Sequence, residues 1–291
     1  MTETRDPSRV VTTRLFGGAG NQLFQYAAGR ALADHLGCDL AVDPRYVEGS
    51  RDRADCFAHF AQARIRRDVD LPPAKTEGLL RYAIWRYMGL PPRIVREKGL
   101  GFDPGFFDLP RGVYLHGYWQ SPRYFAPIAD RLRADLAFTT PLDEANAAMA
   151  ARIEEAPLPV ALHVRRGDYV ASGPYAACTP DYYRRAVDLL AGRSAVPLTC
   201  FVFSNDPDWA RDNLELRQET VIVDHNSEST GHFDMRLQSL CTHNIIANST
   251  FSWWAAWLND TPAKVVIAPR RWFAEGKPDN PDICPPEWIR L

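Results

Sequence analysis

The chain contains very little lysine and almost no net charge. Of its 34 basic residues only 4 are lysine and 30 are arginine, and 36 acidic residues leave a formal net charge of −2 over 291 residues. A nucleic-acid-binding protein is usually basic, so this balance argues against nucleic acid as a partner. Arginine is well suited to bidentate contacts with phosphate. The excess of arginine therefore has two open interpretations, a general preference of the genome or an anion-binding site.

Long apolar runs are also missing. A membrane-spanning helix needs roughly 18 uninterrupted apolar residues, and the most apolar window, residues 251–258, is much shorter. Residues 1–10 are polar and charged, unlike the apolar core of a signal peptide. We therefore expect a cytoplasmic protein with no integral membrane segment. Peripheral association with a lipid-linked glycan at the inner face of the membrane is left open.

Metal-binding and cofactor signatures are absent as well. The six cysteines are widely and irregularly spaced with no CxxC pair, and the histidines show no metal-ligand spacing. Buried, reduced thiols are the expected state in a chain of this size. A GK[ST] phosphate loop and a G-x-S-x-G nucleophile motif are both missing. We therefore expect no metal site and no P-loop nucleotide site.

The C-terminal half of the sequence alternates predicted strands with predicted helices. The strands are short apolar runs at residues 159–164, 198–203, 220–223, 244–247 and 264–268. Helical patterns lie between them at residues 180–190, 207–214, 234–242 and 250–258. Continuous apolar strands alternating with helices indicate a parallel sheet covered on both faces. Such sheets bind ligands beyond the carboxyl ends of their strands.

The N-terminal half carries a weaker form of the same pattern. Strands are predicted at residues 10–15, 39–44 and 112–119, and helices at residues 21–36 and 128–136. Proline pairs interrupt residues 45–110, which predict no clear element. We therefore predict an α/β chain of two Rossmann-like domains, residues 1–150 and 151–291, that are connected near residues 139–158.

Two adjacent arginines follow the predicted strand at 159–164, in the sequence His163-Val164-Arg165-Arg166-Gly167-Asp168. An arginine fork binds phosphate oxygens through short charge-assisted hydrogen bonds, and Asp168 could orient a guanidinium. A surface salt bridge that closes a turn, worth roughly 0–1 kcal/mol, would use the same residue types. Both interpretations stay open on spacing alone.

A second polar group, Asn248-Ser249-Thr250, separates a buried strand from the helix at 250–258. Ser249 or Thr250 can cap that helix. The backbone N–H groups at a helix N-terminus can also bind an anion. Ordinary capping and phosphate binding are therefore both compatible with this segment.

Carboxylates follow the strand at 198–203. Asp206 could accept hydrogen bonds from a guanine edge, and Asp206 with Asp208 could instead form the metal-binding DxD of a metal-dependent glycosyltransferase. Pro207 also begins a helix naturally, which would make Asp208 an ordinary residue of a favourable first turn. All three interpretations stay open.

A glycine-rich turn follows the first predicted strand, in the sequence Gly17-Gly18-Ala19-Gly20-Asn21-Gln22. It is a weak dinucleotide fingerprint, because Leu23 stands where the third glycine would be. The turn still allows the backbone and the Asn21 side chain to approach a ligand closely.

Taken together, these motifs resemble glycosyltransferase family 11, the α-1,2-fucosyltransferases. The residues that carry the resemblance are 17–27, 117–121, 124–125, 163–170, 203–206, 234–241 and 246–254. Ala255 replaces an expected glycine, and Asn205 stands where a second aspartate is common. The resemblance implies that the N-terminal domain, residues 1–150, is the acceptor side. Residues 45–110 of that half match poorly, which leaves the identity of the acceptor undefined.

The resemblance implies a GT-B-like α/β fold with the donor site in the C-terminal half. It also implies GDP-L-fucose as donor, inversion at the anomeric carbon, and no metal or other cofactor. Arg165 is expected to hold the β-phosphate, with His163 and Asp206 at the guanosine. The expected catalytic residues are Arg165, Asp168 and Asn21. The expected donor-binding residues are His163, Arg165, Arg166, Asp206, Ser249, Thr250 and Phe251.

The expected reaction is transfer of L-fucose to the 2-hydroxyl of a terminal galactose in a surface glycan or oligosaccharide. Asp168 is a candidate general base, but an aspartate paired with arginine has a lowered pKa, and a dissociative route is equally open. Another GDP-deoxysugar such as GDP-colitose, a catalytically silent glycan-binding protein and a metal-dependent transferase are the alternatives.

Overall fold

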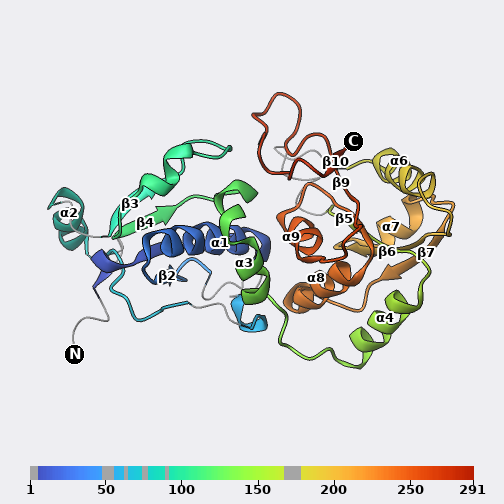
Figure 1. Ribbon diagram of the computed structural model, residues 1–291, viewed down its shortest axis with the longest axis horizontal. Helices are drawn as coiled ribbons and strands as arrows, with labels where there is room; N and C mark the ends of the chain where they lie inside the picture. The colour runs from blue at the N-terminus through green and yellow to red at the C-terminus, as the bar shows by residue number, and fades with distance from the viewer. Residues whose placement is uncertain (1–5, 48–55, 62–64, 74–77, 89–91, 167–177) are drawn as a thin grey trace. The chain divides into compact units, whose positions relative to one another are not determined.

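The computed structural model describes residues 6–47, 56–61, 65–73, 78–88, 92–166 and 178–291. Contacts divide the chain into two compact units, Met1–Ala137 and Phe138–Leu291 (Figure 1). The division falls before the boundary that the sequence predicts between residues 150 and 151. Helix α4 (Glu144–Glu155) consequently belongs to the C-terminal unit.

The N-terminal unit is built on a parallel sheet. Its described strands are β1 (Val11–Arg14), β2 (Leu40–Asp43), β3 (Arg93–Arg96) and β4 (Val113–His116), in the order β2-β1-β4-β3. Its helices are α1 (Ala19–Leu36), α2 (Leu79–Met88) and α3 (Ala129–Asp135). The strand order reverses between β1 and β4, because the chain goes from β1 to β2 on one side and later returns with β4 on the other. Such a reversal leaves a crevice at the carboxyl ends of the two strands.

The C-terminal unit contains a larger parallel sheet. Its described strands are β5 (Pro159–Val164), β6 (Thr199–Ser204), β7 (Glu219–Val223), β8 (His243–Ile245), β9 (Val266–Ala268) and β10 (Ile289–Arg290). The order β10-β9-β8-β5-β6-β7 reverses between β5 and β8. The helices besides α4 are α6 (Pro180–Ala191), α7 (Pro207–Asn213), α8 (Gly231–Leu240) and α9 (Thr250–Leu258).

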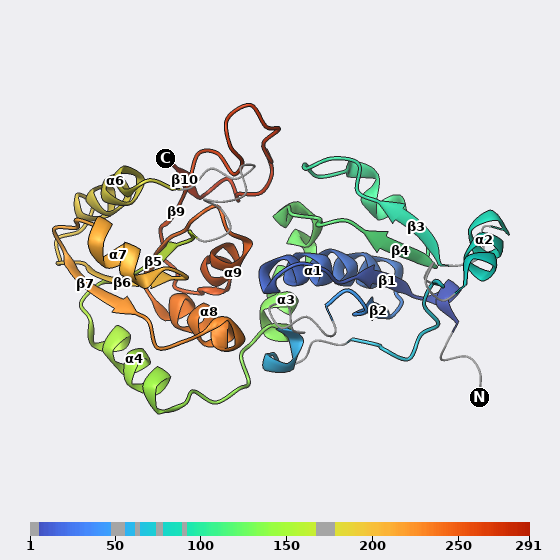
Figure 2. The same cartoon turned by 180° about the vertical axis from the view of Figure 1, so that it is seen from behind.

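Strand β5 is buried on both faces, because alternate side chains point to opposite sides of a sheet. Val160, Leu162 and Val164 pack with the buried side of α6. Ala161 packs instead with residues of α4 and α8. Figures 1 and 2 show α6 on one side of this sheet and α4 and α8 on the other. His163 follows the parity of Ala161, so its side chain points to the α8 side.

The structure confirms the α/β class with parallel sheets, and two predicted elements, β5 and α9, have the predicted bounds. The sequence did not predict α2, β3, α4 or β10. Helix α4 lies inside the stretch that the sequence treats as a connection. Short 3-10 helices are found at Pro7–Arg9, Cys56–His59, Pro104–Asp108, Pro122–Tyr124, Ala126–Ile128 and Glu228–Thr230.

In the part of the chain that the structure describes, no helix combines the length and apolar character that a membrane crossing requires.

Candidate functional site

The ends of β5 and β8 lie side by side at the point where the strand order reverses. Leu162 of β5 is paired with Ile245 of β8, so the residues that follow both strands emerge at one edge of the sheet. The rings of His163 and Phe251 lie with their centroids 5.7 Å apart and 36° between their planes. Two motifs that are distant in sequence are therefore in contact, at the place where parallel α/β sheets bind ligands.

His163 is a buried, uncharged imidazole. Burial lowers its pKa from 6.5 to about 3, and the charge of Arg165 acts in the same direction. The backbone carbonyl of His163 accepts a hydrogen bond of 3.1 Å from the Tyr183 hydroxyl, which fixes the strand end. Its Nδ1 atom is buried and has no hydrogen-bond partner among the described residues. A buried polar atom without a partner is costly, so a ligand group at this position would be stabilised.

The two arginines of the first motif have different surroundings. The guanidinium of Arg166 lies over the Trp209 ring, 4.0 Å from its centroid. The backbone N–H of Arg166 donates to Oδ1 of Asn205 at 2.9 Å. Arg165 is half-buried. Gly167 and Asp168 lie outside the described residues, so the roles predicted for Asp168 stay predictions.

Asp206 caps helix α7. Its Oδ1 accepts a hydrogen bond of 3.1 Å from the backbone N–H of Trp209. Helix α7 begins at Pro207 and has Asp208 in its first turn, as the helix-start interpretation expects. Asp208 is largely exposed and pairs with Arg211 at 2.6 Å. Among the described residues, no group of three or more His, Cys, Asp and Glu side chains is arranged to hold a metal ion. Contact of Asp206 with guanine stays a prediction.

Helix α9 begins after Ser249, whose side chain makes no capping hydrogen bond. Of the two interpretations left open for this segment, capping by the Ser249 side chain is therefore not observed. Asn248 has a structural role: its Nδ2 donates to the Trp272 carbonyl at 2.8 Å. Phosphate contacts of Ser249 and Thr250 remain predicted, as does donor binding by Phe251.

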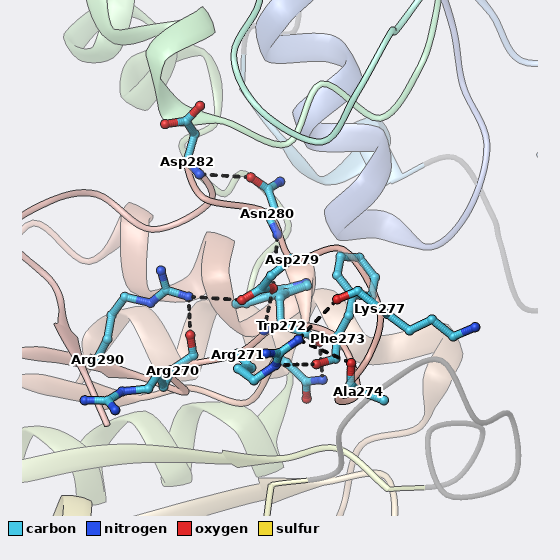
Figure 3. Close-up of polar contacts among 11 residues, drawn as sticks. Arg270, Arg271, Trp272, Phe273, Ala274, Lys277, Asp279, Asn280, Asp282 and Arg290 are labelled. Atoms are coloured by element: carbon cyan, nitrogen blue, oxygen red, sulfur yellow. Dashed lines mark hydrogen bonds and ion pairs between the residues drawn. The ribbon is translucent and has the colours of Figure 1, made fainter.

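The segment that carries Trp272 is held by its own polar contacts (Figure 3). Oδ1 of Asp279 accepts from the backbone N–H groups of Trp272 and Asn280, at 2.9 and 3.0 Å. Arg290 pairs with Asp279 and donates to the Arg270 carbonyl. Arginine side chains in this segment therefore stabilise a loop that supports Asn248.

The glycine turn of the N-terminal unit is closed by two glutamines of α1. The buried Gln25 amide accepts from the N–H of Phe16 at 3.0 Å and donates to the carbonyl of Phe16 at 3.1 Å. Gln22 donates to the carbonyl of Gly17 at 3.1 Å, and Gly17 has a φ of +81°, which favours glycine. Oδ1 of Asn21 accepts from Gln120 at 2.9 Å, which links this turn to the segment after β4.

Two residues that contact predicted site residues, and one buried carboxylate elsewhere in the unit, were not predicted as site residues from the sequence. Tyr183 and Trp209 hold His163 and Arg166 from neighbouring helices. Asp234, in the first turn of α8, has its pKa raised to about 6 by burial, although Asn226 donates to it at 2.7 Å. Tyr183 lies on the apolar face of α6, so its sequence position indicates only core packing.

The fold and the paired strand ends define an α/β, GT-B-like protein with a candidate ligand site in its C-terminal unit. The sequence model described as glycosyl transferase family 11 matches residues 97–291, and the chain belongs to this family. An alpha-1,2-colitosyltransferase of Escherichia coli is 30% identical over 97% of this chain and 99% of its own length.

A galactoside alpha-(1,2)-fucosyltransferase 1 of Lagothrix lagotricha is 27% identical over 94% of this chain and 73% of its own. The solved structure of a mutant Arabidopsis thaliana FUT1 in complex with GDP has a TM-score of 0.54 at 14% identity. The match covers 89% of this chain and 70% of that one, and it establishes similarity of fold.

Proposed function

We propose that this chain is an inverting glycosyltransferase that moves L-fucose from GDP-L-fucose to the 2-hydroxyl of a terminal galactose. The observation that carries the proposal is the contact of His163 with Phe251, which joins the ends of β5 and β8 at the strand reversal. Arg165 follows His163 directly after β5, and Phe251 lies in the first turn of α9. A fucosyltransferase among the relatives and a GDP complex among the similar structures support the choice of donor.

Breaking the bond between sugar and phosphate builds negative charge on the departing GDP. A fixed arginine and the N–H groups of a helix N-terminus stabilise such charge without reorganising. Arg165 and the first turn of α9 are the groups proposed for this task. The acceptor hydroxyl attacks the anomeric carbon as the bond to phosphate breaks, and its proton is lost. Asp168 or solvent would accept that proton.

The neutral imidazole of His163 suits a nucleoside better than a phosphate. At pH 7 it carries no charge, and its Nδ1, which has no hydrogen-bond partner among the described residues, could exchange a hydrogen bond with the base or the ribose. The Asp206 carboxylate accepts one hydrogen bond that caps α7. Its remaining lone pairs could accept hydrogen bonds from the edge of a guanine base.

A second donor, GDP-colitose, is favoured by the 30% identical colitosyltransferase. Colitose lacks one ring hydroxyl that fucose has. A site built to hydrogen-bond that hydroxyl would reject the deoxy analogue by roughly 10⁴-fold, whereas an apolar site discriminates only by about 100-fold. Comparing kcat/KM for the two donors, with the product linkage assigned by NMR, therefore decides between them. A large preference for GDP-colitose, or a linkage other than α-1,2, would overturn the fucosyl proposal.

Titration with GDP separates a transferase from a catalytically silent glycan-binding protein. Calorimetry should show GDP binding to the wild type and much weaker binding to the Arg165→Ala variant. We also propose that no metal takes part, because Asp208 is paired with Arg211 and so does not offer a free second carboxylate beside Asp206. Activity that disappears in excess chelator and returns with a divalent ion would contradict this.

A further inference from the structure

The strand reversal of the N-terminal unit carries a group of aromatic and basic side chains that has no role so far. Arg14, Phe16, Tyr46, His116 and Tyr118 are named the Arg14 cluster here. Arg14 and His116 end β1 and β4, and the other three follow β1, β2 and β4. The cluster therefore lies at the carboxyl edge of the sheet, on both sides of the point where the strand order reverses.

Pairwise contacts connect all members of the Arg14 cluster. The guanidinium of Arg14 lies 3.3 Å from the centroid of the Tyr46 ring and 5.5 Å from that of Phe16. The Phe16 ring lies 4.7 Å from Tyr118 and 5.9 Å from His116. Tyr46 and Tyr118 remain 44% and 42% exposed, so the cluster presents aromatic surface to solvent.

Arg14 also fixes the protonation state of His116. Its Nη1 lies 3.2 Å from Nε2 of His116, and a guanidinium can only donate, so Nε2 must be the unprotonated nitrogen. Burial lowers the pKa of His116, and the charges of Arg14 and Arg96 act in the same direction. The ring is therefore neutral at pH 7 and carries its proton on Nδ1, as a hydrogen-bond donor.

Two carboxylates that the structure describes at this edge, Asp43 and Glu97, are already engaged by protein groups. Asp43 is fully buried and accepts hydrogen bonds from Arg45, at 2.9 and 2.7 Å, and from the Tyr114 hydroxyl at 2.6 Å. Glu97 accepts from the N–H groups of Tyr118 and Trp119, at 2.7 and 2.9 Å. A ligand would therefore meet aromatic faces, a guanidinium and an imidazole N–H.

That combination matches a sugar ring. The C–H groups of a pyranose carry partial positive charge and pack against the negative faces of aromatic rings, while its hydroxyls accept from cationic or neutral N–H donors. A nucleotide fits less well, because Leu23 replaces the third glycine of the phosphate-binding turn and is fully buried.

We propose that the Arg14 cluster is a sugar-binding subsite for the acceptor glycan, with Tyr118 and Phe16 under the ring and His116 and Arg14 donating to its hydroxyls. The assignment of the sugar as acceptor rests on the proposed transferase function. Binding of a neutral glycan to the cluster does not depend on it.

The test measures the KM of lactose, as a galactose-terminated acceptor, for the full chain and its Tyr118→Ala and Phe16→Leu variants. Loss of one aromatic face should raise that KM roughly tenfold, with the KM for the GDP-sugar and the melting temperature unchanged. Tyr87→Ala is the matched control, because Tyr87 is 89% exposed on α2, outside the cluster. It should change neither KM.

Saturation-transfer NMR with lactose alone separates this proposal from the transferase proposal. If no GDP-sugar is turned over but lactose still binds the wild type and not the variants, the transferase function fails and the sugar subsite stands. If transfer occurs and neither variant changes lactose binding or its KM, the subsite is wrong. If the variants raise only the KM for the GDP-sugar, the cluster binds the donor, and the acceptor-subsite proposal is also wrong.

Discussion

The imidazole of His163 and the phenyl ring of Phe251 are in contact, 5.7 Å apart between centroids, although 88 positions separate them in sequence (251 − 163). The contact connects the C-terminal end of β5 to the first turn of α9. It also removes the imidazole from water, and this loss of hydration is the main cause of its lowered pKa.

Acid should therefore destabilise the protein through His163. Its folded-state pKa of about 3 lies below the unfolded value of 6.5, so its contribution to stability is complete above pH 6.5 and is lost as pH falls toward 3. At pH 5 the loss should be about 2 kcal/mol relative to pH 7. The test is urea unfolding of the wild type and of a His163→Gln variant at pH 7 and pH 5. The fall in unfolding free energy between the two pH values should be larger for the wild type.

Asp234 acts in the opposite direction, because its raised pKa of about 6 adds stability on protonation. It is present in both proteins, so its contribution cancels in the comparison. Equal pH dependence of the wild type and the His163→Gln variant would show that the imidazole is not buried neutral.

Replacing Arg165 should remove transfer without unfolding the chain. Loss of one preorganised donor to a developing charge typically lowers kcat on the order of 100- to 1000-fold. Arg184→Ala is the matched control, because Arg184 is exposed on α6 and pairs only locally with Asp181 at 3.2 Å. Turnover of Arg165→Ala within a few-fold of the control would exclude the phosphate role.

The stacking of Arg166 on Trp209 should be measurable as a coupling energy. Both side chains are half-buried, and a cation–π contact of this kind contributes about 0.5–2 kcal/mol. A double-mutant cycle of Arg166→Ala and Trp209→Ala, followed by urea unfolding, isolates the pair. Additive effects of the two substitutions would mean that the ring does not position the guanidinium.

Gly117 should not tolerate a side chain. A Cβ atom there would lie 2.4 Å from Cβ of Glu97 and 2.8 Å from its Oε2. Gly117→Ala should therefore cost about 1–3 kcal/mol of unfolding free energy. Gly99→Ala is the control, since no atom lies within 4 Å of its added Cβ. If the two variants unfold at the same urea concentration, the turn is looser than these distances imply.

The C-terminal sheet was predictable from the sequence because its strands are buried on both faces. Strand β5 is apolar except for His163, and α9 is apolar on nearly every side, so short windows identify them. Helix α4 buries only Asn146 and Ile153, so its sequence lacks the apolar periodicity that would predict a helix. Strand β3 is a four-residue edge strand with exposed arginines at both ends, and β10 has two residues.

The sequence predicted those parts of the candidate site whose location depends only on where the strands end. The residues after β5 and β8 were expected at one edge, and the sheet places them there. The stacking partner of Arg166 and the cap made by Asp206 depend on side-chain directions that spacing does not specify. The Arg14 cluster was missed because its members come from three strand ends spread over residues 14–118.

The alternation of side chains along β5 also sets a rule for engineering. One face of β5 packs into one core through Val160, Leu162 and Val164, and the other face packs into a second core through Ala161. His163 contacts Phe251 only while this alternation of side chains is kept. Adding a single residue within the strand would send every later side chain to the opposite face. Grafted or lengthened versions of this strand must therefore change by two residues at a time to keep His163 in contact with Phe251.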